Sequence, residues 1–383
     1  LYEKLKEFGA VYGSKNGWER PLWFAPEGVA PVDQLDFLEP GWRKYVSEEH
    51  RAVRERVALI DQTSFAKFEI FGTGVLEFLQ TLCVSNMDKP IGSVLYTQMC
   101  NSHGGIEADV TFIRLSSDHF YMVTGSGFGV HDSEWLKSKF PMDGTIHLIE
   151  VTSGKAVINV VGPQSRDLLS KVSESDVSGE AIPFATAKEI IIGAAPVLAS
   201  RIGYVGELGF ELHIPSEFAI HVYKELWQAG QEMDIANVGY RAIESLRMEK
   251  GYLYWSGDIS PDYSPLEAGL GFRVHFDLKD DFLGRQALES QMKNGLDRKL
   301  FTFISEQFLP LTGGETILES GRVVSLATSV AYGFTVKKTI IRGYLDRLYW
   351  GKTEFTVEVF GQRYPVKLAS SPVYDPKNLA LKG

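Results

Sequence analysis

The sequence contains little cysteine, and its histidines are scattered. Only Cys83 and Cys100 occur, and their spacing matches neither a disulfide framework nor a metal-binding motif. The eight histidines include no pair at metal-ligand spacing. We therefore expect no metal site. We also expect a reducing compartment, which is the cytoplasm, or the mitochondrial matrix if the source is eukaryotic.

Long apolar runs and an excess of basic residues are also absent. The most apolar stretch, residues 190–200, is interrupted by Gly193 and Pro196 and is shorter than the roughly 18 residues of a membrane-spanning helix. Lysine and arginine number 39 against 49 acidic residues, a net charge of −10, which argues against a sequence-independent nucleic-acid binder. A local basic pocket for a small anion stays compatible with this charge. We expect neither a membrane nor a nucleic acid as partner.

Signatures of several enzyme classes are missing. The glycines at 72/74 and at 125/127/129 do not lie at a strand-to-helix turn followed about twenty residues later by an acidic residue, as a dinucleotide fingerprint requires. No Gly-x-Ser-x-Gly elbow of a hydrolase occurs. The chain begins at Leu1 rather than at Met and shows no signal peptide, so we expect a processed or excised piece.

The 383 residues exceed a single hydrophobic core and are enough for two or three. Strand-like and helical spacings interleave without a regular βαβ rhythm, which indicates an α+β fold, and the helical spacing ends near residue 296. An irregular arm is expected first, then a helix that Ser47 caps. The predicted units are the N-terminal aromatic arm (1–45), a first α+β domain (46–150), a second α+β domain (151–290) and a C-terminal β domain (291–383), with interleaving of the two α+β segments left open.

One informative segment is residues 101–112, with the sequence NSHGGIEADVTF. A glycine turn leads into a predicted strand on which Val110 and Phe112 share one face and Asp109 lies on the other. A carboxylate at the mouth of a buried strand is desolvated, so it is able to hydrogen-bond an amine or exchange a proton with it. The alternative is a turn-capping Asp109 without a chemical role.

Two further segments carry charged residues on regular elements. In residues 203–212, GYVGELGFEL, Glu211 alternates with Phe210 and Leu212 and faces away from their apolar side. In the predicted helix 240–250, YRAIESLRMEK, the polar residues Arg241, Ser245 and Glu249 stack at i, i+4 and i+8. The alternatives are a solvated strand face and surface ion pairs, and the residues alone do not decide.

Together these segments resemble the aminomethyltransferase (glycine-cleavage T-protein) family, which depends on tetrahydrofolate. The turn before Asp109, the strand from Tyr204 to Glu211 and the helix residues around Arg247 follow that family's motifs. The family's folate-contacting arginine falls on Ile243 of this chain. Arg241 lies two positions earlier, about 200° round the helix, so it is no simple replacement.

A narrower resemblance covers nearly the whole chain. The segments that are similar to the C-terminal half of sarcosine and dimethylglycine dehydrogenases are 17–21 (GWERP), 239–246, 249–252, 264–270 (SPLEAGL) and 375–378 (DPKN). The resemblance implies a three-domain ring of two ferredoxin-like α+β domains and a C-terminal all-β barrel domain. It also implies that Asp109 is catalytic, near the reacting folate nitrogens, that Glu211 binds the pterin, and that Tyr204 and Arg247 contact the cofactor.

The activity that the resemblance implies is formation of 5,10-methylenetetrahydrofolate from an iminium or formaldehyde derived from an N-methyl amine such as sarcosine or dimethylglycine. Tetrahydrofolate is then the cofactor, no flavin binds within this chain, and a flavin-dependent dehydrogenase domain or subunit is an expected partner. Two alternatives stay open. One is a non-catalytic regulator of the pyruvate dehydrogenase phosphatase regulatory type, and the other is a folate-dependent demethylase acting on an O-, S- or N-methyl donor.

Overall fold

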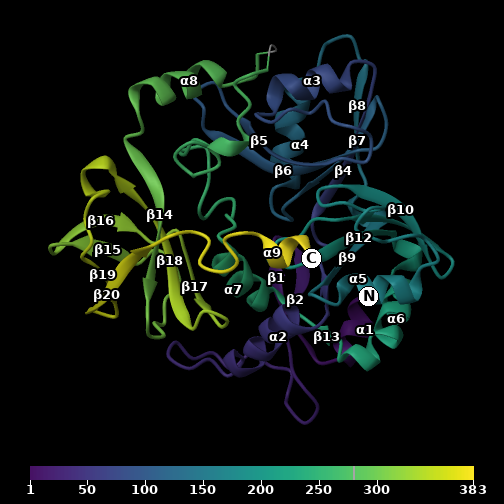
Figure 1. The fold of residues 1–383 in the computed structure, drawn as a ribbon, viewed down its shortest axis with the longest axis horizontal. Helices are drawn as coiled ribbons and strands as arrows, with labels where there is room; N and C mark the ends of the chain where they lie inside the picture. Colours follow the sequence, from purple (N-terminus) through teal and green to yellow (C-terminus); the bar gives the residue numbers. More distant parts are fainter. Residues whose placement is uncertain (279–280) are drawn as a thin grey trace.

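Strands with alternating apolar residues build three large β-sheets around helix α7 (Tyr240–Lys250), as Figure 1 shows. The structure, a computed structural model, describes residues 1–278 and 281–383. The C-terminal sheet lies at the left of the view, and the other two lie at the right, one above the other. The short C-terminal helix α9 (Leu379–Lys382) ends near the middle of the molecule. Helix α7 contacts strand β17 (Ser329–Gly333) of the C-terminal sheet and packs in one apolar cluster with Ile60 and Val161 of the lower sheet.

The upper sheet has five antiparallel strands in the order β5-β6-β7-β4-β8, with two helices on one face. The succession β4-α3-β6-β7-α4-β8 and this order are those of a ferredoxin-like unit, to which β5 adds an edge strand. The elements are β4 (Ala66–Gly72), α3 (Val75–Leu82), β5 (Val94–Cys100), β6 (Ile106–Arg114), β7 (His119–Thr124), α4 (Gly129–Lys137) and β8 (Ile146–Glu150).

The lower sheet has six strands in the order β10-β11-β12-β9-β3-β13 and carries α5 and α6 on one face. Its β9-α5-β11-β12-α6-β13 succession is again ferredoxin-like, with β3 inserted between β9 and β13. The elements are β3 (Ala58–Asp61), β9 (Lys155–Val161), α5 (Ser165–Val172), β10 (Ala187–Ile192), β11 (Ala195–Ser200), β12 (Gly209–Pro215), α6 (Ala219–Ala229) and β13 (Ala236–Asn237), with 3-10 turns η1 (Thr152–Gly154), η2 (Ser216–Phe218) and η3 (Gln231–Met233).

The faces of these two sheets that carry no helix turn toward each other. An apolar cluster that includes Ile113 and Tyr121 of the upper sheet and Leu198 of the lower sheet joins them. The Tyr121 hydroxyl also lies 3.1 Å from Nδ1 of His213. Because side chains alternate along a strand, Asp109 shares the inner face with Ile113, and Glu211 shares it with His213. The two predicted carboxylates therefore belong to opposing inner faces.

The C-terminal sheet is antiparallel, has the order β16-β15-β19-β20-β14-β18-β17, and curls around its own apolar core. A Cβ on Gly343 of β18 would lie 2.7 Å from Oγ of Ser325 in β16, so strands from distant positions in the order come close. Its elements are β14 (Arg298–Ser305), β15 (Thr316–Glu319), β16 (Arg322–Leu326), β17 (Ser329–Gly333), β18 (Lys338–Asp346), η5 (Arg347–Tyr349), β19 (Phe355–Val359) and β20 (Gln362–Ala369). The preceding η4 (Gly271–Arg273) and α8 (Arg285–Asn294) lie outside this sheet, and Leu288 of α8 packs against Val84 and Cys100. The α+β class with a C-terminal β half-barrel is confirmed.

The N-terminal segment differs from the expectation of an irregular arm. It contains α1 (Tyr2–Glu7) and a hairpin of β1 (Ala10–Lys15) and β2 (Trp18–Phe24), and α2 (Arg43–Glu55) starts before Ser47. Ser47 therefore lies inside the helix and does not cap it. Pairing across the hairpin satisfies the backbone of a segment in which prolines and tryptophans suggested no regular structure.

The predicted domain boundaries stay predictions, but one strand exchange bears on them. Residues 58–61 lie inside the segment 46–150 that was expected to form the first α+β domain, yet β3 pairs with β9 and β13 of the lower sheet. The chain thus enters the lower sheet once, leaves it to build the upper sheet, and returns at residue 155. We propose the domain boundaries given above, with the one change that β3 belongs to the second α+β domain.

Candidate functional site

Asp109 lies in the middle of β6, on the inner face of the upper sheet. Its neighbour across the strand pair is Gln98, whose Nε2 donates a hydrogen bond of 2.7 Å to Oδ1 of Asp109. The turn before the strand requires glycine, because a Cβ on Gly105 would lie 1.9 Å from the carbonyl oxygen of Pro261. Burial raises the pKa of Asp109 to about 6, while hydrogen bonds from Gln98 and Tyr96 limit that rise. The carboxylate is therefore held in place and titrates near neutral pH.

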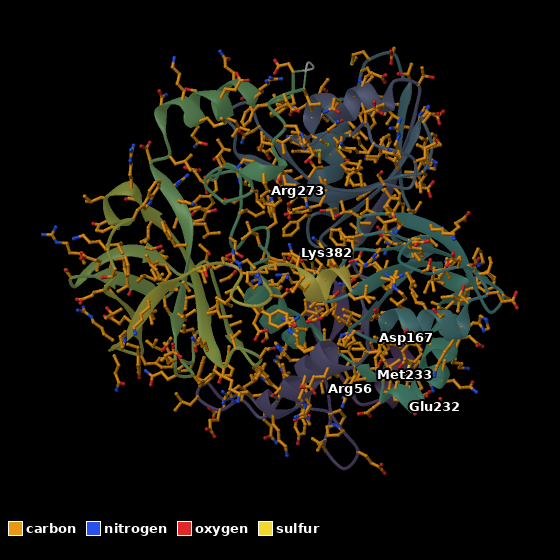
Figure 2. All side chains as sticks on the ribbon, viewed as in Figure 1. Arg56, Asp167, Glu232, Met233, Arg273 and Lys382 are labelled. Carbon is orange, nitrogen blue, oxygen red and sulfur yellow. The ribbon has the colours of Figure 1, made fainter. Side chains whose placement is uncertain are left out.

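Other polar groups from distant segments surround Asp109, and we call Tyr96, Gln98, Asp109, Tyr204 and Arg273 the polar centre. Burial and the Asp109 charge raise the pKa of the Tyr96 phenol, so that it stays protonated. The guanidinium of Arg273 lies over the Tyr96 ring, 5.3 Å from its centroid. Figure 2 labels Arg273 near the middle of the molecule. The polar centre thus combines an acid, an amide, two phenols and a cation.

Tyr204 reaches the polar centre from the loop between β11 and β12. Its hydroxyl donates a hydrogen bond to the carbonyl of Leu253, and its ring stacks on Tyr252 with centroids 5.9 Å apart. The loop turns at Gly206, which has a φ of +82° and faces Lys250 so closely that a Cβ would lie 2.5 Å from its Cγ. The glycine therefore allows the loop to approach α7. The hydrogen bond of its hydroxyl and the stacking of its ring therefore hold the Tyr204 side chain in place.

Glu211 lies on β12, opposite Asn159 of β9 and Ser200 of β11, and we call these three residues the Glu211 row. Both amide atoms of Asn159 and the Ser200 hydroxyl are buried, and none has a hydrogen-bond partner in the described part of the chain. Burial alone raises the pKa of Glu211 to about 7. Buried polar atoms rarely lack partners in proteins, so this row is suited to a polar ligand.

Arg247 lies close to the polar centre, but its guanidinium is fully engaged by the protein. Its nitrogens donate to Glu244, to the Tyr252 carbonyl, to the Ser329 hydroxyl and, over 3.0 Å, to the buried carboxylate of Asp258. An arginine has five N–H donors, and these contacts use the donors of all three nitrogens. The structure therefore favours the ion-pair alternative over the predicted cofactor contact, although the pair is buried rather than on the helix surface.

The position of the family's arginine is occupied by an apolar core residue. Ile243 is 5% exposed and packs in the core between α2, α7 and the N-terminal hairpin. Arg241 forms a two-pronged ion pair with Asp33, at 2.5 and 2.6 Å, and lies over the Trp42 ring. Arg241 therefore anchors the N-terminal segment and does not replace the missing arginine.

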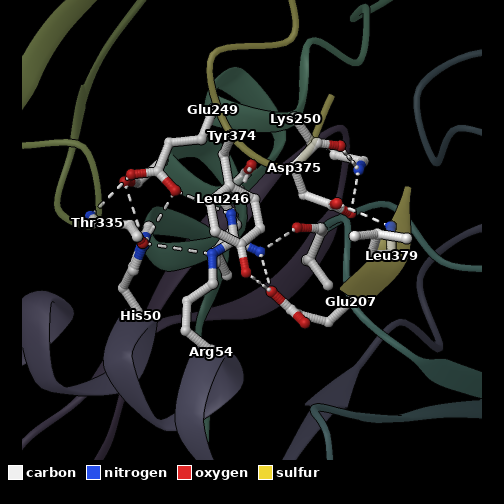
Figure 3. A network of polar contacts seen from close by, with 12 residues as sticks. His50, Arg54, Glu207, Leu246, Glu249, Lys250, Thr335, Tyr374, Asp375 and Leu379 are labelled. Atoms are coloured by element: carbon white, nitrogen blue, oxygen red, sulfur yellow. Dashed lines mark hydrogen bonds and ion pairs between the residues drawn. The ribbon is translucent and has the colours of Figure 1, made fainter. Parts of the chain in front are cut away.

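Behind the loop that carries Tyr204 lies a second polar cluster, shown in Figure 3, which we call the Glu249 network. It joins α2, α7, the loop after β17, the loop before β12 and the C-terminal segment. Its members are His50, Arg54, Glu207, Glu249, Thr335 and Tyr374, with the adjacent pair Lys250–Asp375.

The charges of the Glu249 network are paired within the protein. Arg54 contacts both Glu207 and Glu249 at 2.9 Å, and the Tyr374 hydroxyl donates to Glu207 over 2.7 Å. Burial opposes ionisation of Glu249, but hydrogen bonds from His50 and Arg54 outweigh it and lower the pKa of Glu249 to about 2. This network therefore holds five segments of the chain together.

Sequence reasoning missed five contributors to the site, one of which is Ser200 at the end of β11. Tyr96, Gln98 and Arg273 come from segments without a motif, and Asn159 stands inside an apolar strand, KAVINVV. One polar residue amid such a run was the available signal. Among residues 1–278 and 281–383 no group of three acidic, histidine or cysteine side chains is placed to hold a metal ion. None of the helices described there is both long and apolar enough to cross a membrane.

Comparison with known proteins assigns a family to both parts of the chain. A model described as the GCVT N-terminal domain matches residues 1–278, and one described as the glycine cleavage T-protein C-terminal barrel domain matches residues 298–375. An aminomethyltransferase of Halothermothrix orenii is 32% identical over 90% of this chain and 90% of that protein.

Longer relatives match through one part of their length. Human mitochondrial sarcosine dehydrogenase is 33% identical over 100% of this chain and 47% of that protein. The mouse mitochondrial pyruvate dehydrogenase phosphatase regulatory subunit is 33% identical over 97% of this chain and 45% of that protein. The chain thus spans less than half the length of these two relatives.

The fold is also similar to that of a solved structure. The crystal structure of glycine cleavage system aminomethyltransferase T from Bartonella henselae superimposes with a TM-score of 0.83 and 23% identity. The match covers 97% of this chain and 96% of that one. The two proteins therefore share their fold across all three sheets.

Proposed function

The chain belongs to the glycine-cleavage T-protein family of aminomethyltransferases, and from that premise we propose that it transfers one-carbon units to tetrahydrofolate. The product is 5,10-methylenetetrahydrofolate, and the donor is an iminium or formaldehyde derived from an N-methyl amine such as sarcosine or dimethylglycine. The observation that carries the proposal is that the opposing inner faces of two sheets present a half-buried carboxylate, Asp109, and a row of unpartnered polar groups around Glu211.

The Glu211 row supports binding of the pterin ring. A pterin presents two neighbouring N–H donors, which a carboxylate such as Glu211 accepts side by side. Asn159 and Ser200 flank Glu211 and offer both a donor and acceptors, none of which has a protein partner among the described residues. The residues present therefore fit the cofactor. Tetrahydrofolate, when bound, supplies the ring and side-chain nitrogens that accept the one-carbon unit.

Asp109 supports the chemical role. With a pKa of about 6 it is mostly ionised at neutral pH, so it is able to accept a hydrogen bond or a proton from an amine nitrogen. Gln98 holds one carboxylate oxygen at 2.7 Å, which limits rotation of the group. The protonated phenol of Tyr96 donates to the carboxylate, and the Tyr204 ring, whose hydroxyl is bound to the Leu253 carbonyl, lies nearby. One-carbon transfer requires an amine nitrogen that is held in position against such a base.

The source of the donor and the compartment belong to the same proposal. Sarcosine dehydrogenase continues well beyond the part that this chain matches, so we propose that a flavin-dependent dehydrogenase domain or subunit supplies the oxidised methylamine. Cys83 and Cys100 are both buried and unpaired, which fits the cytoplasm or a mitochondrial matrix.

Calorimetric titration of the purified chain with tetrahydrofolate tests the proposal. We expect saturable binding, weakened in Glu211→Gln and retained in Asp109→Asn, and we expect transfer from a formaldehyde-generating dehydrogenase to fail in Asp109→Asn. The control is Asp118→Asn, in an exposed turn of the same sheet. Absence of folate binding together with a stable complex with a phosphatase would instead support the regulatory alternative, which rests on the similarity to the regulatory subunit.

A second arm of that experiment separates the demethylase alternative. The same chain is incubated with tetrahydrofolate and O-, S- or N-methyl compounds, without any dehydrogenase. The proposed function predicts no methylated folate in this mixture. Its appearance would move the assignment to a demethylase, since the polar centre would then act on the methyl donor directly.

A further inference from the structure

Arg273 is the polar group for which neither the fold nor the proposed transfer has yet given a reason. It ends the 3-10 turn η4, and its guanidinium lies 5.3 Å from the centroid of the Tyr96 ring. Its Nε is buried without a hydrogen-bond partner, and no ion pair to its guanidinium exists in the described ranges of the chain. Burial lowers the pKa of Arg273, while the nearby Tyr96 and Asp109 favour its charge. A partly desolvated cation without a counter-ion lowers the stability of the folded protein, and a bound anion offsets this cost.

Several other arginines near the middle of the molecule pair with carboxylates, whereas Arg342 of β18 donates to the Ser371 hydroxyl instead. Arg54 has Glu207 and Glu249, and Arg247 has Glu244 and Asp258. Arg298 gives the closest comparison, because it also lies over a tyrosine ring, 4.5 Å from the centroid of Tyr263, but pairs with Glu267 at 3.0 Å. Arg273 lies over a tyrosine ring in the same way, but no carboxylate of the described residues pairs with it. The missing element is therefore a carboxylate that the described protein does not provide.

The Tyr96 ring orients this cation. A guanidinium over an aromatic face is restrained in position and leaves its edge nitrogens directed away from the ring. Those nitrogens match the two oxygens of a carboxylate in a forked contact. Asp109 attracts Arg273 without pairing with it, so an anionic and a cationic side chain stand unpaired in one centre. Such a pair of opposite charges is complementary to a ligand that carries a carboxylate and an amine.

We propose that Arg273 binds the carboxylate of a ligand in the polar centre and thereby selects amino-acid-type donors. This inference rests on the proposed function and names the residue that takes up the ligand's negative charge. A carboxylate has two sources in that reaction, the N-methyl amino acid and the glutamate tail of the folate. The presence of Asp109 near Arg273 favours the amino acid, since only that ligand brings a cationic nitrogen close to its carboxylate. The experiment separates the two sources.

The test compares matched ligands by calorimetry on the full chain. One pair is sarcosine and dimethylamine, which differ in the carboxylate of the donor. The other pair is tetrahydrofolate and tetrahydropteroate, which differ in the glutamate tail. Each ligand is titrated into the wild type, Arg273→Gln, Arg273→Lys and the control Arg298→Gln, whose cation is already paired. Thermal unfolding of each variant confirms that the fold is intact.

We expect the wild type to bind sarcosine about tenfold to a hundredfold more tightly than dimethylamine, the size of a charge-assisted hydrogen-bonded contact. Arg273→Gln should abolish that preference, Arg273→Lys should restore part of it, and Arg298→Gln should keep it. If the preference lost in Arg273→Gln is instead the one for tetrahydrofolate over tetrahydropteroate, the carboxylate comes from the folate tail.

The proposal is overturned if Arg273→Gln leaves both preferences unchanged, or if the wild type shows no preference in either pair. Failure of the proposed function has a different signature, because the wild type would then bind neither tetrahydrofolate nor tetrahydropteroate. The sarcosine and dimethylamine pair still tests Arg273 in that case. The two conclusions therefore stand or fall separately.

Discussion

The polar centre and the Glu249 network contain the same kinds of residue, but their charges are arranged differently. In the network, Arg54 bridges two carboxylates, and each of them has a further partner in the protein. In the polar centre and the Glu211 row, Arg273, Glu211 and Asn159 have polar atoms that no described residue contacts. Paired buried charges connect segments, whereas unpaired ones cost stability unless a ligand completes them. The comparison thus separates structural polarity from polarity kept for binding.

The largest effect should come from breaking the network. Glu249→Ala leaves Arg54 buried beside only one carboxylate and should lower the free energy of unfolding by about 3–5 kcal/mol, the cost of an uncompensated buried charge. Urea unfolding measures this change. Glu48→Ala removes an exposed partner of Arg51 on the same helix and should change stability by less than about 0.5 kcal/mol. Equal effects of the two substitutions would refute the assigned role.

Asp109→Asn should act on the reaction and not on the fold. We expect the transfer rate to fall by about 10² to 10⁴, as for loss of a general base, with little change in folate affinity. Because the pKa of Asp109 is raised to about 6, wild-type activity should fall on acidification through pH about 6. A pH–rate profile checks this midpoint. A variant that keeps the wild-type rate and profile would remove Asp109 from the mechanism.

Asp109 also predicts a stability difference of defined sign. Its folded-state pKa lies above the ordinary value, so its stabilising contribution is complete at low pH and is lost as pH rises through about 6. Asp109→Asn lacks this loss and should be the more stable protein at pH 8. Urea midpoints at pH 5 and pH 8 measure the difference.

Glu211→Gln should have the next largest effect, on binding. Replacing the carboxylate by an amide removes charge-assisted contacts to the pterin, and we expect tetrahydrofolate affinity to fall by about tenfold to a hundredfold. Since burial raises the pKa of Glu211 to about 7, the wild type should lose stability as pH rises through that value and the variant should not. Unchanged affinity would show that the row serves another ligand.

The smallest effects are expected for two tyrosines, one in the Glu249 network and one in the polar centre. Because the two side chains are chemically identical, they differ only in their surroundings. Tyr374→Phe removes a hydrogen bond to Glu207, and Tyr204→Phe removes one to the Leu253 carbonyl. Each should cost about 1 kcal/mol of unfolding free energy. Only Tyr204→Phe should weaken ligand binding, by a few-fold in calorimetry. If Tyr374→Phe weakens binding equally, the network is part of the site.

Much of the secondary structure was predictable, because local periodicity sets it. The alternation around Asp109 and around Glu211 correctly indicated strands with their carboxylates opposite the apolar side. The start of α2 was wrong, since tertiary contacts of the N-terminal hairpin extend that helix toward Arg43. The sheet to which β3 belongs was undetermined, because a short strand with three apolar residues pairs equally well with either sheet.

The site was predictable only where a motif marked it. Asp109, Tyr204 and Glu211 lie in segments that resemble a family, and the structure brings Tyr204 and Asp109 into one electrostatic environment. The motif also included Arg247, whose neighbours Asp258 and Ser329 could not be identified from the helix alone. Arg273 and Asn159 had no motif, so only the pairing of distant strands and loops brought them to the site.

The sequence by itself determined which elements form, where glycine turns interrupt them and which side of each strand carries its polar residues. These properties depend on neighbours a few positions away, so they can be read along the chain. The tertiary structure decided that the inner faces of two sheets oppose each other and that Arg247 is paired while Arg273 is not. Alternation fixes the side on which a charge lies, but whether that charge finds a partner depends on residues that are distant in the chain and close only after folding.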